Sequence, residues 1–136
     1  MMDKRQLTIA IALLIASTLL VGCEREKAPK SAAEAMHLPE PGYVADAKRG
    51  QGLFQVKCAA CHGLDARGTD KGPPLVHSIY RPGHHADLSF HLAVKNGVRQ
   101  HHWNFGNMDP VKGVTPENAA DIIAYVRKEQ RTAGIN

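Results

Sequence analysis

The chain has 136 residues, of which 43% are hydrophobic and 22% are charged, which allows one small globular domain with an extension but not two domains. The formal net charge is +4, and no run of Lys or Arg is longer than two residues. Nucleic-acid binding needs basic residues gathered on one surface, so the composition argues against a nucleic acid as partner.

Residues 1–22 have the pattern of an export signal. A charged start with Lys4 and Arg5 precedes an apolar run from Leu7 to Val21. As a helix this run would cover about 22 Å, which is short of a hydrocarbon core of about 30 Å. The pattern therefore favours a signal peptide over the alternative, an uncleaved membrane anchor.

The signal ends in "LVGC", which resembles the lipobox of bacterial lipoproteins. The resemblance implies that Cys23 becomes the lipidated first residue of the mature protein. The several acyl chains of a lipoprotein cysteine anchor a protein stably, whereas a single chain binds a membrane only marginally. We therefore expect a protein tethered on the periplasmic side of a bacterial membrane. Glu24 in place of an Asp favours the outer membrane, and simple secretion is the alternative.

Residues 23–42 contain charged residues, Ala and three Pro, without an apolar period. Such a segment cannot bury enough surface to offset its ordering entropy, so we expect a flexible tether with a reach of about 25 Å. His37 lies in this segment and is expected to be solvated. The globular domain then comprises residues 43–136.

The segment "KCAACHG" places Cys58, Cys61 and His62 at the end of an expected helix. A thioredoxin-like dithiol would need neighbouring strands, and a zinc site would need further ligands at metal spacing. The C-x-x-C-H pattern is the haem-attachment motif. Two thiols three residues apart can bond to the two vinyl groups of one porphyrin, and the following His is held as an axial iron ligand. The motif predicts one haem c attached through Cys58 and Cys61; a disulfide or zinc is the alternative.

Around this motif, residues 44–133 resemble the class I c-type cytochromes. The resemblance implies an all-α fold in which three or four helices surround one covalently attached haem. It also implies a contact between the first and last helices. Gly50 and Phe54, which share one helical face, would meet Ile122 and Tyr125 there.

Residues 63–85 are rich in Gly, Pro, Asp and His, which predicts a long loop. Within it, "GPPL" resembles the Gly-Pro-x-Leu element of the same family. The resemblance implies that the Pro73 carbonyl accepts a hydrogen bond from His62 and that Leu75 packs on the haem. Such an acceptor fixes the ring and raises the basicity of the ligand nitrogen. A simple turn with two prolines is the alternative.

Two more helices are expected in the second half of the chain. Asp87 can cap a helix over residues 88–96, which Gly97 would end. Thr115–Pro116 is a favourable start for the last helix, which would end before Gly134.

The segment "RQHHWNFGNMDP" offers three candidate iron ligands, His101, His102 and Met108. Class I cytochromes carry their second axial ligand, a Met, in this part of the chain, so the resemblance implies Met108. A buried core Met, or ligation by one of the two His, is the alternative. Ligation by Met and His places a haem toward the high end of the potential range.

Eight His are present, and only His62 has an assigned role. The others are expected mostly to be solvated or hydrogen-bonded to backbone, and Arg99, His101, His102 and Trp103 are candidate donors to the haem propionates. A second metal site is the alternative, with copper as the candidate for imidazole ligands. The unassigned His outside the tether are His77, His84, His85, His91, His101 and His102.

The resemblance implies a non-enzymatic electron carrier that shuttles single electrons between membrane or periplasmic redox partners. An upstream cytochrome or copper protein would supply the electrons, and an oxidase or reductase would receive them. Two alternatives stay open. One is a haem enzyme or gas sensor in which Met108 dissociates, and the other is a redox partner in copper handling through the His-rich segment.

Overall fold

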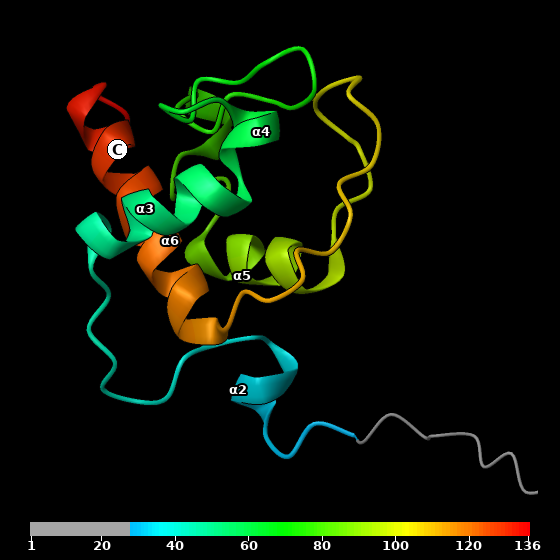
Figure 1. The fold of residues 1–136 in the computed structure, drawn as a ribbon, viewed down its shortest axis with the longest axis vertical. Coiled ribbons are helices and arrows are strands. Elements are labelled where there is room, and N and C mark those ends of the chain that lie inside the picture. Colours follow the sequence, from blue (N-terminus) through cyan, green and yellow to red (C-terminus); the bar gives the residue numbers. More distant parts are fainter. Residues whose placement is uncertain (1–27) are drawn as a thin grey trace, which may run out of the picture.

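The computed structural model describes residues 28–136, and it is helical (Figure 1). The elements are α2 (Ala32–Ala35), α3 (Ala47–Lys57), α4 (Ala59–His62), a 3-10 turn (Ser78–Tyr80), α5 (Asp87–Asn96) and α6 (Pro116–Thr132). Within residues 28–136 the one β feature is an isolated antiparallel bridge between Val98 and Met108. The expected all-α fold is confirmed.

The signal peptide and Cys23 lie outside the described residues and stay predictions. In the part of the chain that the structure describes, none of the helices combines the length and the apolarity that a membrane crossing requires.

Helices α3 and α6 pack against each other and cross (Figure 1). Gly50 of α3 lies directly against the backbone carbonyl of Asp121 in α6, so the two backbones touch where a side chain would keep them apart. One turn further along α3, the Phe54 ring meets the Tyr125 ring at a centroid distance of 5.3 Å, and both rings are buried. The predicted contact between the first and last helices is confirmed.

The carboxylate of Asp121 is the polar anchor of this crossing. It is almost fully buried and accepts hydrogen bonds from the Asp46 backbone N–H at 2.7 Å, Arg49 Nε at 2.9 Å and the Tyr43 hydroxyl at 3.0 Å. Burial alone would raise the pKa of Asp121, but these donors outweigh it and hold the pKa below its ordinary value. The carboxylate therefore stays ionised and ties the start of α3 to α6.

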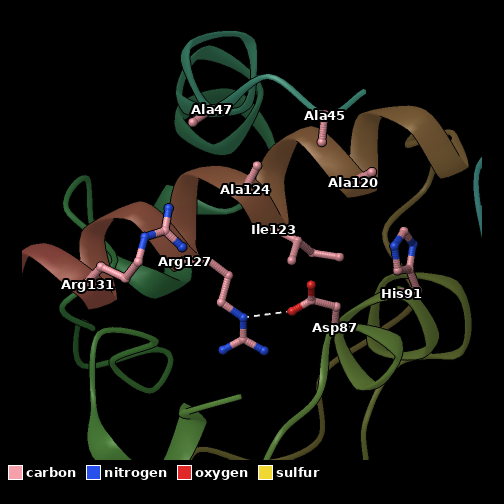
Figure 2. Close-up of a pocket in the computed structure, with 9 residues that line it drawn as sticks. All are labelled: Ala45, Ala47, Asp87, His91, Ala120, Ile123, Ala124, Arg127 and Arg131. Carbon is pink, nitrogen blue, oxygen red and sulfur yellow. Dashed lines mark hydrogen bonds and ion pairs between the residues drawn. The ribbon is translucent and has the colours of Figure 1, made fainter. Parts of the chain in front are cut away.

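Helix α5 begins one residue earlier than the sequence predicts. Ala86 is its N-cap residue and Asp87 is its first helical residue, so the predicted capping role of Asp87 is wrong. The Asp87 carboxylate instead pairs with Arg127 Nε of α6 at 2.7 Å (Figure 2). Gly97 ends α5 with a φ of 73°, and α6 begins at the Thr115 cap, both as predicted.

Part of the segment expected to be a flexible tether is folded onto the domain. Ser31 caps α2, and the Lys95 ammonium of α5 donates hydrogen bonds to the carbonyls of Glu34 and Ala35 at 2.9 and 2.8 Å. The expectation that His37 is solvated is wrong, because its Nε2 is buried and burial lowers its pKa. Composition alone did not show that a Lys sixty residues away would hold these carbonyls.

Candidate functional site

The C-x-x-C-H motif lies at the junction of α3 and α4. Cys58 ends α3 and starts the single turn of α4, which carries Cys61 and His62. Both thiols are free; Cys58 is half-buried and Cys61 is exposed. Burial, and secondarily the neighbouring Cys61, raises the pKa of Cys58 to about 11, so this thiol is protonated at neutral pH.

The proximal side of the site is fixed by one hydrogen bond to His62. Its Nδ1 lies 2.9 Å from the Pro73 carbonyl oxygen, which can only accept, so Nδ1 carries the proton. The Nε2 lone pair is then the one available to a metal. Burial lowers the pKa of His62, which favours the neutral, metal-binding form.

The loop after the motif is held close to the motif by its own backbone. Gly68 N–H donates to the His62 carbonyl at 2.7 Å, and the Thr69 hydroxyl donates to the Cys61 carbonyl at 2.6 Å. A Cβ at Gly72 would lie 2.9 Å from that same Cys61 oxygen, so the close return of the chain requires glycine. This packing brings Pro73 to His62.

Leu75 sits where this loop turns back toward the core. Its N–H and that of Val76 both donate to the carbonyl of Ala66, which is fully buried. Leu75 is partly buried and packs against the hydrophobic core. The sequence did not single out Ala66, which adopts a positive φ of 56°, because nothing distinguishes it from any other Ala.

Met108 lies at the base of the loop between α5 and α6. It exchanges two backbone hydrogen bonds with Val98, each of 2.9 Å, and its side chain is half-buried. The backbone of Gly97 touches the Met108 carbonyl, which leaves no room for a larger residue at position 97. Residues 99–107 thus form a closed loop whose end fixes the backbone of Met108.

Trp103 joins this loop to the segment before α5. Its ring lies 5.2 Å from the ring of His77 at a steep angle. Burial raises the pKa of the neighbouring Tyr80 hydroxyl, an effect that Trp103 partly offsets, but this hydroxyl lies outside hydrogen-bond geometry. The buried Trp103 Nε1–H therefore lacks a hydrogen-bond partner among residues 28–136. A buried donor without an acceptor is costly. The carboxylate of a bound cofactor would satisfy it, so Trp103 fits a haem propionate.

The donor set also fits haem. Two free thiols lie on one turn, the adjacent imidazole presents Nε2, and a thioether is held on a separate loop. In c-type haem proteins two Cys thiols bond to the haem vinyl groups, and an imidazole and a Met thioether ligate the iron. The residues implied by the sequence resemblance thus have compatible chemistry, and hydrogen bonds hold the segments that carry them.

The unassigned histidines have different surroundings. His77 Nδ1 accepts a hydrogen bond from the Ile79 backbone N–H, as expected. His91 is buried on α5 beside His37, so the expectation of a solvated or backbone-bonded ring is wrong for it. The remaining four, His84, His85, His101 and His102, gather where the turn before α5 meets the loop of residues 99–107.

Known proteins match the chain over the region that contains these features. The family model described as Cytochrome c matches residues 47–130, from the start of α3 into α6. Cytochrome c-551 of Bacillus subtilis (strain 168) is 29% identical over 128 residues, which cover 94% of this chain and 99% of that protein. The solved structure of cytochrome CL from Methylophaga aminisulfidivorans is 25% identical, with a TM-score of 0.45, and the match covers 81% of this chain and 71% of that one.

Proposed function

The chain belongs to the cytochrome c family and carries haem c attached through Cys58 and Cys61, and from this premise we propose that it shuttles single electrons between other redox proteins. Haem c supplies an iron that takes up and releases one electron. We propose an upstream cytochrome or copper protein as donor and an oxidase or reductase as acceptor. The observation that supports the proposal best is the hydrogen bond from His62 Nδ1 to the Pro73 carbonyl beside two free thiols.

In this proposal His62 Nε2 and the Met108 thioether would be the two protein ligands of the haem iron. The Pro73 carbonyl orients the imidazole and raises its basicity. The bridge to Val98 holds the backbone of Met108. Two ligands on fixed backbones change position little when the charge of the site changes, which favours rapid electron exchange over binding of a substrate at the metal.

Met108→Ala tests this assignment. The oxidised wild-type protein should show the long-wavelength Met-to-iron charge-transfer band, and the variant should lose it and have a lower reduction potential, because the thioether favours the reduced iron. Visible spectroscopy and redox titration of the haem-loaded protein measure both. Met36→Ala is the control and should keep the band, because Met36 is the C-cap residue of the short helix α2 and is not a candidate ligand.

Two results would contradict the ligand assignment or the carrier function. A wild-type protein without the charge-transfer band would show that Met108 is not the ligand. Rapid binding of carbon monoxide to the reduced wild-type protein would favour the enzyme or gas sensor, because an electron carrier keeps both axial ligands bound.

We also propose that Cys23 anchors the protein by lipid on the periplasmic side of a bacterial membrane, in the outer membrane. The support is the "LVGC" sequence and the residue that follows it. Cys23→Ala should move the protein from the membrane to the soluble fraction while its haem spectrum is unchanged, as measured by fractionation and visible absorbance. A variant that stays in the membrane fraction with the wild-type protein would contradict the lipid anchor.

A further inference from the structure

Three histidines converge at a surface where two separate segments meet. His84 and His85 lie in the turn that precedes α5, and His102 comes from the loop of residues 99–107. One ring nitrogen from each lies within 4.8 Å of the others. His84 and His102 are exposed and His85 is half-buried, so an ion from solvent can reach the cluster.

The spacing suits a metal ion. His84 Nε2 and His102 Nε2 are 3.4 Å apart. Metal–nitrogen bonds of about 2.0–2.1 Å place two ligands of a tetrahedral ion roughly 3.3 Å apart. Separations of up to 4.8 Å must shorten by up to about 1.5 Å, and rotation of the exposed His84 and His102 rings about their side-chain bonds can supply this movement.

A hydrogen bond to the Ile79 carbonyl orients the His85 ring for metal binding. Its Nδ1–H donates a hydrogen bond to the Ile79 carbonyl oxygen at 2.9 Å, which leaves the Nε2 lone pair free. Histidine ligands commonly donate their other ring N–H to a carbonyl in this way. The His85 carbonyl in turn accepts a hydrogen bond from Arg127, so backbone and ring are both held.

The turn that carries the pair is also fixed. The N–H groups of His84 and His85 both donate to the Arg81 carbonyl, at 2.9 and 2.8 Å. His102 belongs to a loop that Trp103 joins to His77. The cluster therefore combines one well-held ligand with two exposed ligands that can adjust.

We propose that His84, His85 and His102 form a surface site for a divalent transition-metal ion. Three imidazoles without a carboxylate favour Cu²⁺ and Zn²⁺ over Mg²⁺ and Ca²⁺, and Cu²⁺ binds more tightly than Zn²⁺ to a given set of nitrogen ligands. Binding would join the turn before α5 to the loop that leads to Met108. The proposal does not depend on the identity of the axial ligands or on electron transfer.

Metal titration of the full haem-loaded chain, expressed without a histidine tag, tests the site. Zn²⁺ is the first probe because it cannot exchange electrons with the haem, and Cu²⁺ is the second. Calorimetry and competition with a chelating dye should give one ion per chain, with Cu²⁺ bound more tightly. His84→Gln and His102→Gln should each weaken Zn²⁺ binding roughly tenfold or more, the loss typical when even the supporting shell of a metal site is broken.

His101→Gln is the matched control. His101 is exposed and its ring lies 4.3 Å from that of His102, but its Nδ1 is bound to the Arg99 carbonyl and it is outside the group of three. This variant should bind Zn²⁺ within about threefold of wild type, a difference of less than 1 kcal/mol. An unchanged far-ultraviolet circular dichroism spectrum shows that each variant is folded.

Three outcomes would overturn the proposal. The wild-type protein could bind no ion, binding could be unaffected in both His84→Gln and His102→Gln, or His101→Gln could lose as much affinity as they do. None of these results would bear on the electron-carrier proposal, which the Met108→Ala spectrum tests separately.

Discussion

Replacing Gly50 by Ala should destabilise the domain severely. A Cβ at this position would lie inside the van der Waals contact distance of the Asp121 carbonyl carbon and oxygen. These are backbone atoms within α6, so no side-chain rotation can relieve the overlap and the two helices must separate. Overpacking of a rigid core costs 1–3 kcal/mol and sometimes more, and we expect at least about 3 kcal/mol here, out of a typical total of about 5–15.

Guanidinium unfolding of the haem-loaded protein, followed by circular dichroism, measures this loss. Gly52→Ala is the control, since Gly52 lies two residues away on the same helix and a Cβ there would have nothing within 4 Å. Ala is a better helix former than Gly, so this variant should gain up to about 1 kcal/mol. Equal stability of Gly50→Ala and wild type would mean that α3 and α6 do not cross as described.

The sequence was most informative where a short motif is typical of only one kind of site. The motif from Cys58 to His62 specifies its own chemistry, and the contact of Gly50 and Phe54 with Tyr125 follows from the resemblance built around that motif. The structure agrees at the helix crossing and at the hydrogen bond from His62 to Pro73. In both places the resemblance to the family, and not the spacing along the chain, identified the groups that meet.

The sequence was least informative about buried polar groups. Asp121, Arg127 and Gln130 lie on the buried side of α6, although the apolar pattern of that helix would place polar residues toward solvent. Their partners are distant in the chain; Gln130, for example, donates to the Leu75 carbonyl at 2.8 Å. Backbone carbonyls of an irregular loop have no signal in a sequence, so no pattern could identify the side chains that satisfy them.

The histidine cluster was unpredictable for a related reason. The sequence showed two pairs of adjacent histidines, but not that the turn before α5 and the loop of residues 99–107 bring three of them together. The number of histidines suggested a second metal site only as one of several possible roles for these residues. Which rings converge was decided by how the two loops pack.

Arg127→Met should show how strongly one buried cation stabilises the segment before α5. The guanidinium donates to the Tyr80 carbonyl at 2.6 Å, to Gln130 Oε1 at 2.7 Å and to the His85 carbonyl, and it pairs with Asp87 (Figure 2). Met preserves the apolar packing but removes the donor to the His85 carbonyl and to Gln130 Oε1, whereas the Tyr80 carbonyl keeps a hydrogen bond from Gln130 Nε2 at 3.0 Å. Because each unsatisfied buried group costs about 1–3 kcal/mol, we expect a loss of at least about 2 kcal/mol.

Arg131→Met is the matched control, because Arg131 lies one turn further along α6 with an exposed side chain, and its replacement should change stability by no more than about 0.5 kcal/mol. Hydrogen exchange should locate the damage in Arg127→Met, with faster exchange of the amides of His84 and His85 than of those at the centre of α3. The Asp87 side chain is 62% exposed and can regain water, so the ion pair itself contributes little. A loss as small as that of Arg131→Met would therefore mean that the His85 carbonyl finds another donor, and that the segment carrying His84 and His85 is held by its own turn and not by Arg127.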